Sequence, residues 1–388
     1  MQYFFTLGNN PTLSVAEISA VFGMSGKILD TVYIIETENK INAKDSIKKM
    51  GGVIKIGKIE SKTSAENKNE IIKEVIKLLD PKNGKFKFGF SYYGHKKFNF
   101  KSIAMEVKKY LRENNISCRW VISKEKTLSS VVVEQNKLTS SGAEIVLIED
   151  GYKLLIGKTS AVQPFKELSK RDYGRPARDD RSGMLPPKLA QIMINLSGAD
   201  LKNKILLDPF CGSGTILTEA LLAGFENLIG SDISEKAISD TKKNIEWIKQ
   251  NSDTTNLKKI HLQLFNINAT EISRKLKPNS VDIIVTEPYL GQQRGKVDLQ
   301  KQIKELEILY SRALKEFKKI IKNNGRIAII FPVFFNKYFI NPDLNGFKII
   351  NSVPDSLLNS KNIVLTARNT IVYGRPRQKV WREIVLMQ

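Results

Sequence analysis

One nonapeptide, LDPFCGSGT at residues 207–215, constrains the fold of this chain more than any other stretch. The apolar run at residues 204–207 predicts a buried parallel strand, and residues 215–223 predict a helix. The turn between them contains Gly212 and Gly214, which adopt backbone conformations that other residues avoid and let a ligand approach the main chain. A helix N-terminus also favours a carboxylate or a phosphate. The stretch therefore predicts an α/β fold with a ligand site beside its first strand.

The second half of the chain alternates strand and helix patterns from residue 188 onward. Strands are expected at 204–207, 227–230, 260–264, 281–285 and 326–331, and helices at 188–196, 215–223, 235–250 and 299–322. Such alternation predicts a doubly wound, mostly parallel sheet of the Rossmann-like kind. A dinucleotide site is not predicted, because Leu217 occupies the position of the third glycine in that fingerprint.

The first half of the chain has a different character. Residues 1–162 mix strands and helices in an order typical of small α+β units. Residues 163–187 are rich in Arg, Asp, Gly and Pro with little apolar periodicity, which predicts a linker or an extended arm. We therefore expect an N-terminal α+β subdomain at 1–50, a second α+β unit at 51–162, a linker at 163–187 and the α/β domain at 188–388.

The chain is strongly basic, with 62 Lys and Arg against 40 Asp and Glu and a net charge of +22. Abundant Lys, Asn and Ile are also what AT-rich coding bias produces, but such bias favours Lys over Arg. An arginine cluster in the expected linker therefore indicates a polyanionic partner, nucleic acid first. The cluster comprises Arg171, Arg175, Arg178 and Arg181.

Several classes of protein are not predicted. The two cysteines, Cys118 and Cys211, lie in different segments, and only two histidines are present, so neither a disulfide scaffold nor a metal site is expected. Cys211 lies within the glycine-containing turn, where a role in packing is a better interpretation than a role as a nucleophile. No apolar run approaches the ~20 residues of a membrane span, and no signal peptide pattern opens the chain. We expect a cytoplasmic protein.

With Phe210 between Asp-Pro and Gly-x-Gly, the nonapeptide resembles motif I of S-adenosylmethionine (SAM)-dependent methyltransferases that act on exocyclic amino groups. In a sheet of this kind the ligand lies outside the carboxyl ends of the strands. Asp208 ends the first strand and can hold the amino group of SAM. Asp232 lies 18 residues beyond Gly214, near the spacing at which a carboxylate reaches ribose hydroxyls, although it can equally cap the next helix, for which Ser234 competes.

The other expected cofactor contacts follow from the same resemblance. Phe210, Gly212 and Gly214 form the turn, and Ile233 can lie on the adenine. Asn268 and Ala269 stand where similar enzymes have Asp-Ala, which receives the adenine amino group. An amide oxygen still accepts a hydrogen bond, but without charge. An ordinary polar loop remains an equal alternative for this pair.

The expected strand at 281–285 ends in Thr286-Glu287-Pro288-Tyr289, and Thr286 lies 78 residues after Asp208. Amino-methyltransferases have Asn/Asp-Pro-Pro-Tyr/Phe at this place. A side-chain oxygen and a main-chain carbonyl accept the two N–H groups of the amine and direct its nitrogen, while the aromatic ring stacks on the base. We expect Thr286 and Glu287 to share the acceptor role, Pro288 to fix the turn and Tyr289 to stack. The alternative is a structural turn in an inactive SAM-binding protein.

Over nearly its full length the chain resembles THUMP-containing tRNA guanine-N2-methyltransferases, similar to enzymes that modify guanosine at position 10. The residues that carry the resemblance are Thr127-Leu128-Ser129-Ser130-Val131, Leu155-Ile156-Gly157-Lys158-Thr159, Val162-Gln163-Pro164-Phe165, Arg171-Asp172-Tyr173-Gly174-Arg175-Pro176, Leu185-Pro186-Pro187-Lys188-Leu189-Ala190 and Asn195-Leu196-Ser197. The resemblance implies ferredoxin-like and THUMP units before the methyltransferase domain. It also implies that helix 188–196 closes over the methionine end of SAM.

The implied substrate is tRNA, with the THUMP unit holding its acceptor end. Lys96 and Lys97, beside Tyr92, Tyr93 and Phe98, suit contacts with RNA, as the linker arginines suit phosphates. Alternation of lysine with aromatic residues is equally typical of an amphipathic strand. Two other functions stay open: a DNA adenine-N6 or cytosine-N4 methyltransferase, and a non-catalytic RNA-binding protein that retains the SAM fold. We expect a monomer without metal, and a small activator protein stays open as a partner.

Overall fold

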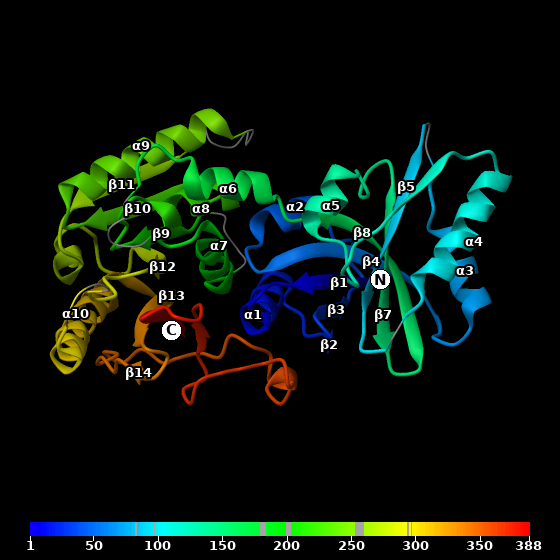
Figure 1. Ribbon diagram of the computed structural model, residues 1–388. Coiled ribbons are helices and arrows are strands. Elements are labelled where there is room, and N and C mark those ends of the chain that lie inside the picture. Colours follow the sequence, from blue (N-terminus) through cyan, green and yellow to red (C-terminus); the bar gives the residue numbers. More distant parts are fainter. Residues whose placement is uncertain are drawn as a thin grey trace. The chain divides into compact units, whose positions relative to one another are not determined.

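The computed structural model describes residues 1–81, 84–96, 98–178, 184–198, 203–252, 260–292, 295 and 297–388 (Figure 1). The chain divides into two compact units. Unit 1 comprises Met1–Pro11 and Met24–Phe165, and unit 2 comprises Thr12–Gly23 and Lys166–Gln388. Within the described residues, each unit is built on one eight-stranded sheet.

Unit 1 confirms the α+β character expected for the first half of the chain. Its elements are β1 (Gln2–Leu7), β2 (Lys27–Leu29), β3 (Val32–Glu36), α2 (Ala43–Lys49), β4 (Val53–Ser64), α3 (Lys68–Lys77), β5 (Phe86–Tyr93), α4 (Phe100–Glu113), β6 (Cys118–Val121), α5 (Ser130–Gln135), β7 (Ala143–Asp150) and β8 (Lys153–Val162). The strand order is β2-β3-β1-β4-β8-β7-β5-β6, with β5 parallel to both β6 and β7. One sheet thus joins strands from residues 1–50 to strands from residues 51–162.

Helices α2, α3 and α4 of unit 1 begin at asparagines. The side chains of Asn42, Asn67 and Asn99 each accept a hydrogen bond from the backbone N–H three residues later. This capping satisfies a donor that the first turn of a helix leaves without a partner. Helices α3 and α4 then bury apolar residues, such as Val75 and Val107, against the sheet.

Unit 2 confirms the doubly wound, mostly parallel sheet. Its elements are α1 (Pro11–Phe22), α6 (Phe165–Tyr173), α7 (Pro187–Leu196), β9 (Ile205–Asp208), α8 (Thr215–Ala223), β10 (Asn227–Asp232), α9 (Glu235–Asn251), β11 (His261–Asn266), the 3-10 helix η2 (Ala269–Arg274), β12 (Val281–Thr286), α10 (Leu299–Ile320), β13 (Ile321–Phe334), β14 (Tyr338–Phe339), the 3-10 helix η3 (Asp355–Leu357), β15 (Ile371–Tyr373) and β16 (Val380–Met387).

The strand order of unit 2 is β11-β10-β9-β12-β13-β16-β15, with β14 paired to β13. The first five strands are parallel, and β16 runs antiparallel to β13. The order reverses at β9, which has β10 on one side and β12 on the other. The carboxyl ends of β9, β10 and β12 are therefore the place where such a sheet binds its ligand.

The segment at 163–187 differs from the linker or extended arm that its composition suggested. Its first part forms helix α6, with Glu167 in the first turn and Lys170 and Arg171 in the last. This arrangement of charges complements the helix dipole. Leu168 is the buried residue of this helix, which explains why apolar periodicity gave little signal.

Candidate active site

A cavity lies at the carboxyl ends of β9, β10 and β12. Ten of the twelve residues expected to bind the cofactor or act in catalysis line it: Asp208, Phe210, Gly212, Asp232, Ile233, Asn268, Ala269, Glu287, Pro288 and Tyr289. The other two, Gly214 and Thr286, lie behind this wall. Sequence reasoning missed several further lining residues, among them Met184, Lys236, Asp240 and Leu309, because they carry no local motif.

The turn after β9 depends on Gly214. This residue begins helix α8 with φ of +83°, and a Cβ atom placed on it would lie 2.9 Å from the Thr241 side chain. Both the left-handed backbone and the close approach exclude larger residues. The Thr241 hydroxyl in turn donates to the carbonyl of Gly212, at 2.8 Å. Gly214 therefore shapes the turn from behind, while Gly212 faces the cavity.

Asp232 holds two backbone groups of the cavity wall. One carboxylate oxygen accepts from Gly212 N at 3.0 Å, and the other accepts from Ser234 N at 2.9 Å. Ser234, rather than Asp232, caps helix α9, since its side chain accepts from Ala237 N. The alternative role of Asp232 as a helix cap is therefore excluded. The adjacent Ile233 is 71% exposed and offers an apolar surface at the cavity.

Asn268 lies in the cavity wall and also caps the 3-10 helix η2. Its Oδ1 atom accepts from Thr270 N at 3.0 Å. A carbonyl oxygen has two lone pairs, so one stays available for a second donor. The capping bond fixes the orientation of the Asn268 amide, and a role of Asn268 in adenine binding stays a prediction.

Asp208 is almost completely buried at the end of β9. Its Oδ1 atom accepts from the Thr286 hydroxyl at 2.8 Å and from Phe210 N at 3.2 Å. Burial, reinforced by the nearby carboxylates of Asp232 and Glu287, raises the pKa of Asp208 to about 8. The Asp208 carboxyl therefore keeps its proton at neutral pH unless a cation approaches it.

The residues that follow β12 are divided between the cavity and the core. Thr286 is fully buried, and its hydroxyl donates to Asp208 instead of facing the cavity. Glu287 does line the cavity, and its Oε1 atom accepts from Arg382 Nε of β16 at 2.5 Å. Both side chains of this ion pair are nearly buried, with exposed fractions of 12% and 10%. Arg382 lies 95 residues from Glu287, and sequence reasoning gave no signal for it.

Tyr289 is 58% exposed and lies in the cavity wall. Its backbone carbonyl accepts a hydrogen bond, at 3.2 Å, from the hydroxyl of Tyr310, a buried residue of α10. This bond anchors the main chain and leaves the Tyr289 ring accessible. Pro288, with its fixed φ, lies between the carboxylate of Glu287 and this ring.

Two of the arginines expected to contact phosphates are used inside unit 2, which corrects that expectation for them. Arg171 makes a two-pronged ion pair with the buried Glu219, at 2.7 and 3.2 Å. Arg175 is 6% exposed and donates to the Thr215 hydroxyl at 2.6 Å. The physical reason is that the buried Glu219 carboxylate and the buried Thr215 hydroxyl oxygen accept hydrogen bonds from these guanidinium groups, which are then not free to bind phosphates.

The other expected RNA contacts are differently placed. Arg178 is half-buried, donates to the carbonyl of Tyr173 at 3.3 Å and packs on the ring of the same residue. Lys96 is exposed, 3.7 Å from a Glu149 carboxylate oxygen. Lys97 and Arg181 lie outside the described residues. A role of Arg178 and Lys96 in RNA binding stays a prediction.

Two other features are absent from the described residues. Among the described residues, no helix is long and apolar enough to cross a membrane. In the same part of the chain, no group of three or more His, Cys, Asp or Glu side chains is arranged to hold a metal ion.

Two family models match the chain. The model described as an RMKL-like methyltransferase domain matches residues 175–335, which include every residue of the cavity wall. The model described as a DNA methylase matches residues 33–243, which is more than half of the chain. The resemblance to SAM-dependent methyltransferases is thereby confirmed.

Among known proteins, the chain is similar to the tRNA (guanine(10)-N2)-dimethyltransferase of Methanocaldococcus jannaschii, with 29% identity over 50% of this chain and 51% of the relative. The same-named enzyme of Pyrococcus abyssi is 30% identical over 53% of this chain and 56% of the relative. The matched part thus spans about half the length of these relatives.

A solved structure, TrmN from Thermus thermophilus, shares the fold, with a TM-score of 0.52, 16% identity and coverage of 100% of this chain and 99% of that one. The fold of unit 2, the composition of its cavity wall and the two family models agree with one another. The chain therefore belongs to the SAM-dependent methyltransferases that the DNA methylase model represents.

Proposed function

We propose that this chain transfers a methyl group from SAM to the exocyclic N2 amine of a guanosine in tRNA, at a place like position 10. One observation carries the proposal: the turn after β9 and the residues after β12 line the same cavity. A donor and an amine can therefore meet there. The names of the curated relatives supply the substrate, tRNA guanosine, and the number of methyl groups stays open.

The donor set of the cavity fits SAM. Asp208 is a carboxyl group that an ammonium would ionise, and Asp232 presents a carboxylate suited to a ribose diol. Ile233 offers an apolar surface for the adenine, and the Asn268 amide can accept from its amino group. Bound SAM would supply an electrophilic methyl group on a sulfonium.

The residues after β12 that line the cavity suit the amine. The lone pair of a guanine N2 atom is shared with the ring, so acceptors for its N–H groups make the nitrogen a better nucleophile. The Glu287 carboxylate is such an acceptor, and the ion pair with Arg382 holds it in place. As the nitrogen–carbon bond forms and the sulfur–carbon bond breaks, the amine loses a proton, which Glu287 can accept. Tyr289 can stack on the unstacked base.

Affinity for the donor is expected to rise with pH. Because the pKa of Asp208 is about 8, an ammonium must displace a proton when it binds. The dissociation constant should then fall by about tenfold between pH 6 and pH 7. Calorimetric titration with S-adenosylhomocysteine, in two buffers of different ionisation enthalpy, measures both the affinity and the released proton. Asp208→Asn should bind more weakly with a flat pH profile, and a flat wild-type profile would refute this role of Asp208.

The proposed substrate is tested by methyl transfer to defined nucleic acids. Purified chain is incubated with tritiated SAM and either bulk tRNA or bulk DNA, and the product is digested to nucleosides. We expect label in N2-methylguanosine or N2,N2-dimethylguanosine. Label in N6-methyladenine or N4-methylcytosine of DNA would favour the second candidate, which the DNA methylase match supports. Donor binding without transfer to either would indicate a non-catalytic protein.

A further inference from the structure

Two turns of unit 2 meet beyond the carboxyl ends of the parallel strands, the end of the sheet at which the cavity lies. One is the turn at 335–337 between β13 and β14, and the other is the turn at 374–379 between β15 and β16. Phe335 N donates to the carbonyl of Lys379 at 2.7 Å, so the two turns are joined. Because the parallel strand β13 ends at this place, the turns extend past the carboxyl ends of its neighbours, where the cavity lies.

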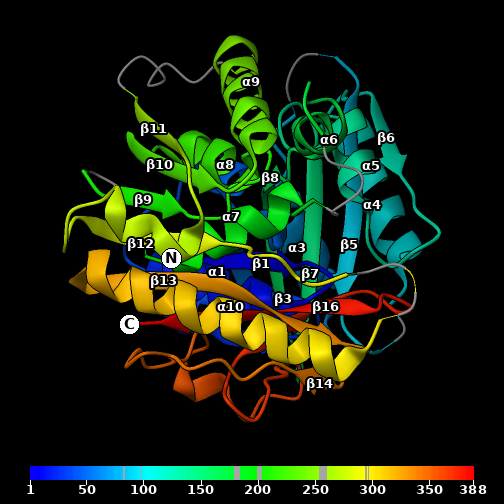
Figure 2. The same cartoon turned by 90° about the vertical axis from the view of Figure 1, so that its left-hand side faces the viewer.

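Strand β16 connects these turns directly to the catalytic segment. Figure 2 shows β13 and β16 running alongside each other, and Phe334 pairs with Val380 at their end. Arg382, which holds Glu287, lies three residues after Lys379 on β16. At 3.2–3.4 Å per residue, the turns lie about 10 Å beyond that ion pair along the strand. A nucleic acid whose base enters the cavity would therefore pass close to them.

The joined turns are basic, and exposed aromatic rings lie in and beside them. We call six of these side chains, including Tyr338 at the start of β14, the basic tip: Phe335, Lys337, Tyr338, Arg375, Arg377 and Lys379. Phe335 and Tyr338 are 56% and 38% exposed. None of the four cations makes an ion pair within the described part of the chain, and the stretch from 374 to 379 contains no acidic residue. Lys337 lies 5.4 Å from the centre of the Tyr338 ring. Cations without acidic partners beside accessible rings suit a single-stranded nucleic acid, which offers phosphates and unstacked bases together.

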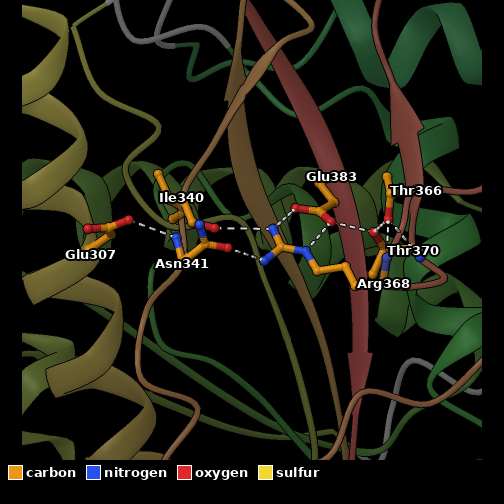
Figure 3. Close-up of polar contacts among 7 residues, drawn as sticks. All are labelled: Glu307, Ile340, Asn341, Thr366, Arg368, Thr370 and Glu383. Carbon is orange, nitrogen blue, oxygen red and sulfur yellow. Dashed lines mark hydrogen bonds and ion pairs between the residues drawn. The ribbon is translucent and has the colours of Figure 1, made fainter.

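A buried polar network lies on the strand and segments that lead to the basic tip (Figure 3). Glu383, the fully buried neighbour of Arg382 on β16, accepts hydrogen bonds from Arg368 and Thr370. Arg368 also donates to the carbonyl of Ile340 at 3.1 Å and to the side chain of Asn341 at 3.0 Å. The segment between β13 and β16 is thereby tied to the strand that carries the tip.

We propose that the basic tip binds the phosphate backbone and unstacked bases of the tRNA nucleotides that flank the target guanosine. This proposal rests on the proposed function, because it takes the target base to lie in the cavity beside Glu287. It assigns tRNA contacts to unit 2 itself, separate from those expected of unit 1. The positive charge of the basic tip favours a polyanionic partner. The exposed rings favour nucleic acid over an acidic protein surface.

The test compares two variants of the full chain that each lose three exposed cations. The first is Arg375→Ala/Arg377→Ala/Lys379→Ala. The matched control is Lys275→Ala/Lys277→Ala/Lys315→Ala, in which two of the lysines precede β12 at the opposite, amino end of that strand. Fluorescence anisotropy with labelled tRNA gives the dissociation constant between about 50 and 200 mM salt, a range over which phosphate contacts change affinity strongly. Calorimetric titration with S-adenosylhomocysteine verifies that the cavity of each variant still binds this ligand.

We expect the tip variant to bind tRNA at least about tenfold more weakly at low salt, with a salt slope smaller by about two to three. The control should keep the wild-type slope, and both should bind S-adenosylhomocysteine as the wild type does. A tip variant indistinguishable from the control would overturn the proposal, even if the wild type methylates tRNA. The proposal would also be overturned if the tip variant lost affinity for duplex DNA but bound tRNA as the wild type does. Failure of the proposed function would instead appear as a wild type that transfers no methyl group to tRNA.

Discussion

Glu287→Gln is expected to lower the rate of methyl transfer by about 100-fold or more, since a positioned proton acceptor contributes about 10²–10⁴-fold. The substitution keeps the shape of the side chain and an acceptor for Arg382, but removes the negative charge that faces the cavity. Affinity for the donor should stay close to that of the wild type, because Glu287 lies on the wall assigned to the amine. Single-turnover transfer to tRNA measures the chemical step.

Two controls accompany this measurement. Glu305→Gln makes the same chemical change at an exposed position of α10 and should leave the rate unchanged. Thr286→Val removes the hydroxyl that donates to Asp208, so it should alter donor binding more than transfer. If Glu287→Gln kept the wild-type rate, the proposed role of Glu287 as the proton acceptor would be wrong.

Lys55→Met is expected to destabilise unit 1 by about 3–5 kcal/mol, the usual cost of leaving a buried charge without its partner. The Lys55 ammonium is 2% exposed, pairs with the fully buried Glu144 and donates to the carbonyl of Leu128 at 2.6 Å. Glu144 would keep only the hydroxyls of Ser91 and Thr159, at 2.5 and 2.7 Å. Thermal unfolding followed by circular dichroism should show a midpoint lower by about 10 °C.

The matched control lies on the same strand, β4. Lys58→Met removes an exposed lysine, whose pair with Glu60 is 37% accessible on each side, and should change stability by less than about 1 kcal/mol. The double variant Lys55→Met/Glu144→Gln removes the uncompensated charge and should recover more than half of the loss. An effect of Lys55→Met as small as that of Lys58→Met would show that the buried pair contributes little.

Much of the proposed donor site was predictable from local sequence. The turn at Gly212 and Gly214 follows from the backbone freedom of glycine, and the spacing to Asp232 follows from one βαβ unit. Ser234 was recognisable as a competing helix cap, and the structure assigns it that role. Such features depend on residues close in sequence, so a short pattern is enough to predict them.

The roles of the arginines were not predictable in the same way. A cluster rich in Arg indicates a polyanion, yet Arg171 and Arg175 bind Glu219 and Thr215 of α8. Nothing near Glu219 in the sequence marks it as a buried carboxylate that requires a guanidinium. A net charge reports how many cations a chain has, but only packing decides which of them face solvent.

The sequence by itself determined the class of fold, the glycine-containing turn after β9 and the place of the residues proposed to face the amine, because hydrophobic periodicity, glycine placement and strand ends are local properties. Only the tertiary structure decided that Thr286 faces Asp208, that Arg382 holds Glu287, and that two distant turns join as the basic tip. These contacts join residues 78, 95 and 44 positions apart, and chain folding brings them together through strand pairing. The physical reason is that a side chain's partner depends on which strands become neighbours, which no short pattern encodes.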